Sequence, residues 1–98
     1  MGDLLPVGSV VMLEGGSKKT VIMGILQFNL EEQDKLYDYL GVPYPEGYMG
    51  SGSSYFFNHD SIAEIFFRGY ENQERQDMLA ILEKIRQGAE EIVEKEIF

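Results

Sequence analysis

The fold is decided by residues 9–28, SVVMLEGGSKKTVIMGILQF. Two apolar, β-branched runs, residues 9–14 and 20–28, flank a Gly-Gly-Ser-Lys-Lys turn, and this pattern is typical of a β-hairpin. Successive residues are apolar in both runs, so both faces of each strand need cover, which a lone hairpin cannot supply. Gly24 lies inside the second run, where a missing side chain commonly marks a bulge or a bend. The hairpin is therefore expected to belong to a larger curled sheet with a second layer against it.

Further strands are predicted downstream of the hairpin. Residues 36–42 are aromatic and strand-like, residues 55–57 read as a short strand, and residues 65–70 as the last one. A turn at residues 44–47 and a glycine- and serine-rich loop at residues 50–54 connect them. The sheet should therefore contain four or five strands.

The apolar period changes from residue 71 onward. Asn72 is a plausible helix N-cap, and the acidic residues that follow favour the positive end of the helix dipole. Apolar side chains then recur at spacings of three and four, at Met78, Ile81, Leu82, Ile85, Ala89, Ile92 and Val93. This spacing predicts a long amphipathic helix, and we expect it to pack Leu82, Ile85 and Ala89 on the sheet.

These elements predict one α+β domain over residues 1–98, with a β-rich body at residues 4–70 and a C-terminal helix at residues 72–98. The sheet is expected to be antiparallel and curled, with a partly open SH3-like barrel as one form of it.

The helix is predicted to outreach its own domain. Twenty-four residues of helix span about 36 Å, whereas a body of 70 residues is roughly 28 Å across. The overrun carries Ile92, Val93, Ile97 and Phe98, and an apolar cluster at a chain end indicates a surface that a partner covers. A second candidate surface is the rim around Tyr44 and Tyr48, because tyrosine offers amphipathic contact area at low entropic cost.

Composition excludes several classes of partner. The chain has 17 Asp and Glu against 8 Lys and Arg, a net charge of -9, which argues against nucleic acid and against anionic membranes. The absence of cysteine removes disulfides, thiolate nucleophiles and cysteine-based metal sites. Residues 1–6 resemble no targeting signal, and no apolar run approaches the length of a membrane span, so we expect a cytoplasmic protein without membrane insertion.

The sequence contains few residues in patterns typical of an active site. His59, the only histidine, lies near Asp60 and Glu64, a set that metal sites and general bases also use. Because no second imidazole or thiol accompanies it, a structural role is favoured over metal binding or catalysis. Ser51 and its glycine neighbours lack the strand–turn–helix context of a nucleophile elbow. We therefore predict no enzyme activity, no catalytic or metal-binding residues and no cofactor.

Five segments, read together, carry a family resemblance. They are residues 5–11 (LPVGSVV), 37–39 (YDY), 44–47 (YPEG), 57–62 (FNHDSI) and 67–70 (FRGY). In this order and spacing they resemble a small family of unknown-function proteins from Gram-positive bacteria, encoded beside type VII (Esx) secretion genes and their LXG-type toxins. The resemblance covers about residues 4–72 and carries no catalytic residue onto this chain.

The resemblance implies a cytoplasmic accessory role in which the protein holds or escorts a secreted toxin or a secretion component. The expected function is thus a non-catalytic chaperone-like binding protein, with self-association through the C-terminal helix as a further expectation. The alternative is an immunity protein that neutralises a cognate toxin through its acidic surface.

Overall fold

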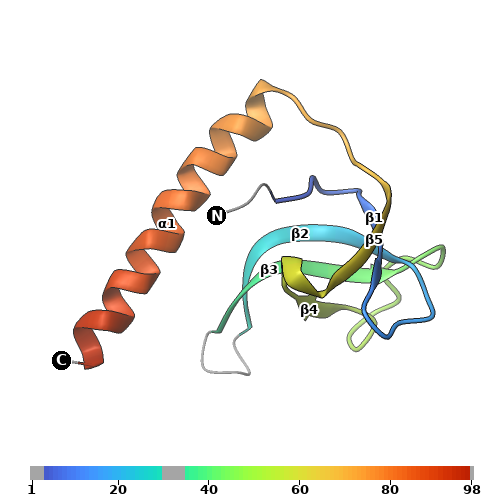
Figure 1. The fold of residues 1–98 in the computed structure, drawn as a ribbon, viewed down its shortest axis with the longest axis horizontal. Coiled ribbons are helices and arrows are strands. Elements are labelled where there is room, and N and C mark those ends of the chain that lie inside the picture. The colour runs from blue at the N-terminus through green and yellow to red at the C-terminus, as the bar shows by residue number, and fades with distance from the viewer. Residues whose placement is uncertain (1–3, 30–34, 98) are drawn as a thin grey trace.

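The computed structural model describes the backbone of residues 4–29 and 35–97, and the side chains of these residues up to residue 88. Five strands and a C-terminal helix follow one another along the chain (Figure 1). The elements are β1 (Val10–Leu13), β2 (Thr20–Asn29), β3 (Lys35–Pro43), β4 (Tyr55–Phe57), a short 3-10 turn (His59–Ser61), β5 (Ile62–Phe67) and α1 (Gln73–Ile97). The chain is thus an α+β protein, as predicted.

The strands form one antiparallel sheet in the order β4-β3-β2-β1-β5. The predicted hairpin is present, with Val10 opposite Val21. β2 is long because it pairs with both β1 and β3, and it curves strongly in Figure 1. Its register with β3 shifts between Ile22 and Gly24, which confirms the predicted irregularity at Gly24. The sheet is open, since β4 and β5 each have one neighbour among the described strands.

The last strand differs from its prediction. We expected residues 65–70, but β5 begins at Ile62, directly after the 3-10 turn, and ends at Phe67. The turn ends the preceding loop and returns the chain to extended geometry at Ile62. The segment after Phe67 instead forms a linker to α1.

The sheet and the N-terminal segment share a hydrophobic core. Its buried apolar residues are Leu4, Leu5, Val11, Ile22, Ile25, Tyr39, Val42 and Phe57. Leu4 and Leu5 belong to the N-terminal segment, which runs between α1 and the sheet in Figure 1. The second layer predicted from the hairpin therefore consists of this segment together with the helix.

The beginning of α1 follows the sequence prediction. The backbone N–H of Arg75 donates to the side-chain oxygen of Asn72 at 3.0 Å, so Asn72 is the N-cap. Leu79 and Leu82 pack against the core. Ile85 was expected beside them, and this was wrong, because 52% of its surface is exposed. Ala89 lies on α1, and its side chain lies outside the described residues.

Candidate functional site

A buried tyrosine ties the N-terminal segment to the sheet. Tyr39 is fully buried, and its hydroxyl accepts a hydrogen bond from the backbone N–H of Leu5 at 2.8 Å. The same hydroxyl lies 2.6 Å from Nδ1 of His59. The hydroxyl oxygen has two lone pairs and one proton, so it can form both hydrogen bonds at once. Burial raises the pKa of Tyr39 above its usual value of 10.

Asp38 also contacts the segment that carries His59. Its carboxylate accepts a hydrogen bond from the backbone N–H of His59 at 2.9 Å, while its own N–H donates to the side-chain oxygen of Asn58. Arg86 of α1 lies 3.8 Å from the Asp38 carboxylate. The carboxylate thus meets the backbone of His59 and not its ring, so the two do not form an acid–base pair. This arrangement matches a structural histidine.

Metal binding has no preassembled site within the described residues. No group of three or more His, Asp or Glu side chains in that part of the chain is placed to hold an ion. Asp60 and Glu64, the two acids considered with His59 in the sequence, follow it on the 3-10 turn and on β5. The polar groups that reach His59 come instead from β3, some 20 residues earlier in the chain.

A large apolar area lies on β5 and the linker after it. Ile65 and Phe66 are each 44% exposed, Phe67 is 60% exposed and Tyr70 is 80% exposed. We call these four residues the β5 surface. Single exposed apolar residues are common on proteins, but four within six residues of chain make this segment a candidate interaction site. Lys19 lies 4.9 Å above the ring of Phe66, so a cation borders this surface.

The free edge of β5 is irregular. Its register with β1 shifts twice, between Val10 and Val11 and between Met12 and Leu13. Bulges of this kind twist an edge strand and hinder the addition of another strand. Recognition at β5 should therefore use its side chains more than its backbone.

The helix presents two different rows of side chains. One row, Arg75, Leu79, Leu82 and Arg86, faces the body and is half-buried. The neighbouring row, Met78, Ile81 and Ile85, is 39%, 59% and 52% exposed. We call these three residues the α1 row. The single apolar stripe predicted from the sequence is thus divided, and only one part of it packs on the body.

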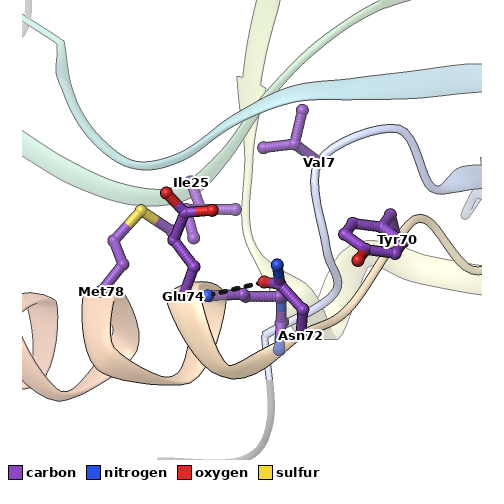
Figure 2. A pocket seen from close by; sticks show the side chains of 7 residues that line it. Val7, Ile25, Tyr70, Asn72, Glu74 and Met78 are labelled. Carbon is purple, nitrogen blue, oxygen red and sulfur yellow. Dashed lines mark hydrogen bonds between the residues drawn. The ribbon is translucent and has the colours of Figure 1, made fainter.

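A pocket of about 440 Å³ opens where α1 begins (Figure 2). Its walls come from the N-terminal segment, β2, the linker and the first turns of α1, and they comprise Val7, Ile25, Tyr70, Asn72, Glu74, Arg75 and Met78. The guanidinium of Arg75, one of these residues, donates to the carbonyl of Leu4 and pairs with Glu71 at 3.4 Å. Apolar walls with a few polar groups suit the side chain of a partner.

The partner residues predicted from the sequence have different outcomes. Tyr44 and Tyr48 are 45% and 60% exposed, and their role in binding stays a prediction. Ile92, Val93 and Ile97 lie on α1, but their side chains, like the whole of Phe98, lie outside the described residues.

Sequence reasoning missed the β5 surface. It placed candidate partner surfaces only at the end of the helix and at the rim around Tyr44 and Tyr48, although apolar residues on successive positions of a final strand also fit an uncovered edge.

The fold defines a class: a small α+β domain with an open curled antiparallel sheet, whose described residues include exposed apolar side chains on β5 and α1. The chain belongs to the family described as a domain of unknown function, DUF4176, whose model matches residues 4–78. The matched region includes the whole sheet, the β5 surface and the first turns of α1. Searches of curated proteins and of solved structures find no significant match. No helix in the described part of the chain is long and apolar enough to cross a membrane.

Proposed function

We propose that this protein is a non-catalytic cytoplasmic binding protein of a type VII secretion system, acting as a chaperone or adaptor for an LXG-type toxin. The secretion context rests on the resemblance of residues 4–72 to proteins encoded beside such toxins. The binding role rests on the surface of the molecule.

The β5 surface is the observation that carries the proposal. Four large apolar side chains are exposed within six residues of chain, three on the edge strand β5 and Tyr70 on the linker after it. Burying a side chain such as Phe or Leu contributes about 1.5–3 kcal/mol relative to leaving it in water. Covering Phe67 and Tyr70 with a partner would recover most of that free energy, and aromatic anchors of this kind commonly dominate an interface.

The proposal is tested by co-expression with each LXG toxin encoded near the gene, followed by affinity purification. The toxin should co-purify with the wild-type protein and be lost or strongly reduced with Phe67→Ser. Met49→Ser is the matched control, because Met49 is 61% exposed and Phe67 60%. If Phe67→Ser retains the toxin as well as Met49→Ser does, the β5 surface is not the binding site.

The immunity alternative is favoured by one observation, the net charge of -9. An acidic protein can complement the basic active site of a toxin that acts on nucleic acid. Toxin activity, measured as growth inhibition in cells that express both proteins, separates the two roles. A chaperone leaves the bound toxin active, whereas an immunity protein abolishes its activity.

A further inference from the structure

The described side chains of α1 attach this helix of 25 residues to the body at few points. Leu79 and Leu82 pack against the core, and both are only partly buried. Arg86 lies 3.8 Å from the carboxylate of Asp38, which is long for an ion pair. In Figure 1 the N-terminal segment runs between α1 and the sheet, so the helix contacts that segment as well as the core. The free energy that holds α1 in place is therefore small for its length.

The docked helix also buries a cation whose hydrogen bonding is incomplete. The side chain of Arg75 is 9% exposed, and its guanidinium donates to the carbonyl of Leu4 and pairs with Glu71. Its Nε is buried and has no hydrogen-bond partner among the described residues. Water would satisfy this donor, so its burial opposes the docked state. Release of Arg75 to solvent therefore offsets part of the free energy that undocking loses at Leu79 and Leu82.

The linker before α1 is fixed at its first end and free at its second. The backbone N–H of Gly69 donates to the side-chain oxygen of Ser9 at 3.0 Å, which holds the start of the linker on the body. Among the described residues, no backbone hydrogen bond joins residues 70–72 to the body. The ion pair of Arg68 with Glu71 crosses this stretch, but both side chains are nearly half exposed, so it contributes little. A short stretch of this kind can absorb the backbone rotation of a hinge.

We propose that α1 is a hinged lid, which undocks from the body about residues 70–72 while the sheet stays folded. The walls that α1 contributes to the pocket move away with the helix, whereas Val7 and Ile25 stay on the body and are uncovered (Figure 2). The undocked state is a minor one, and we expect it in on the order of 1% of the molecules. A change that weakens the docked contacts should raise this fraction without unfolding the sheet.

Paired spin labels measure the position of the lid, because the chain has no cysteine of its own to take up label. Glu64→Cys on β5 and Lys84→Cys on α1 place the labels at exposed positions on either side of the hinge. Pulsed electron paramagnetic resonance of the full-length protein should show one distance between them. Adding Leu82→Ala should raise the undocked population about thirtyfold, to about a quarter of the molecules. A second distance, longer and broader than the first, should then appear.

Ile85→Ala is the matched control, since it shortens an exposed side chain of the same helix, and it should keep the single distance. Hydrogen exchange separates undocking from unfolding. In Leu82→Ala the amides of α1 should exchange first, while those of β2 and β3 remain protected. An unchanged single distance in Leu82→Ala, an equal second distance in Ile85→Ala, or loss of protection in β2 and β3 together with α1 would overturn the proposal. These measurements need no toxin, so they do not depend on binding at the β5 surface.

Discussion

Replacing Tyr39 with Phe removes one oxygen atom and breaks two long-range contacts. The hydroxyl of Tyr39 is the acceptor for the buried N–H of Leu5, and it also bonds to His59. Leaving a buried donor unsatisfied costs about 1–3 kcal/mol, and the bond to His59 adds about 0.5–1.5 kcal/mol. We therefore expect Tyr39→Phe to lower the free energy of unfolding by about 2–4 kcal/mol, a large share of the stability of a domain this small.

Urea unfolding followed by circular dichroism measures the effect, and two variants serve as controls. His59→Ala keeps the bond to Leu5, removes the hydrogen bond to His59 and the ring contact at 5.8 Å between centroids, and should cost about 1 kcal/mol. Tyr48→Phe removes a hydroxyl from a side chain that is 60% exposed and should cost close to nothing. If Tyr39→Phe is no less stable than Tyr48→Phe, the hydroxyl does not hold the N-terminal segment on the sheet.

The same hydroxyl predicts a pH dependence. Burial raises the pKa of Tyr39 above 10 in the folded protein, so the folded state holds its proton more tightly than the unfolded state does. The corresponding stability is fully present below pH 10 and is lost as pH rises through the folded-state pKa. Tyr39→Phe should therefore lose less stability than the wild type as pH rises above 10. The urea midpoints of the two proteins, measured across this pH range, test the difference.

Three further predictions concern the helix, two glycines and metals. Leu82→Ala should lower the free energy of unfolding by about 2 kcal/mol, because Leu82 packs on the core. Ile85→Ala should change it by less than about 0.5 kcal/mol, because Ile85 is exposed. Equal urea midpoints for the two variants would contradict the division of the helix into two rows. Gly41→Ala should destabilise the fold by about 1–3 kcal/mol, since an added Cβ would meet neighbouring side chains at 2.5 and 2.8 Å. Gly88→Ala, with nothing within 4 Å, should raise helix stability by up to about 1 kcal/mol; the reverse ranking in thermal melts would refute both assignments. Zinc or calcium should leave the melting temperature unchanged, and a rise that disappears in His59→Ala would show that the histidine binds metal.

The regular elements could be predicted because their signals are local. The hairpin, the irregularity at Gly24 and the cap at Asn72 each depend on a few neighbouring residues, and the structure contains all three. The curl of the sheet followed from the need to cover both faces of the hairpin. These inferences use only chain geometry and the period of apolar residues.

What the sequence left open depends on contacts between distant residues. The hydrogen bond between Tyr39 and His59 joins residues 20 positions apart, and no sequence spacing predicts such a contact. The stripe on α1 is wide enough to pack in more than one rotation, and the rotation that occurs places Leu79, Leu82 and the buried side chain of Arg75 toward the body. Ile85 is therefore exposed to solvent, whereas the apolar periodicity alone predicted that it packs on the sheet. The exposure of Phe67 likewise depends on β5 lying at the edge of the sheet.

The proposed binding role depends most on the β5 surface, and isothermal titration of a purified LXG toxin into the purified protein tests toxin binding there most directly. We predict that Phe67→Ser combined with Tyr70→Ser weakens binding at least tenfold, while Tyr48→Ser and Met49→Ser bind as the wild type does. Unchanged affinity in the first variant, or loss of affinity with Tyr48→Ser instead, would contradict the claim and assign recognition to the rim around Tyr44 and Tyr48.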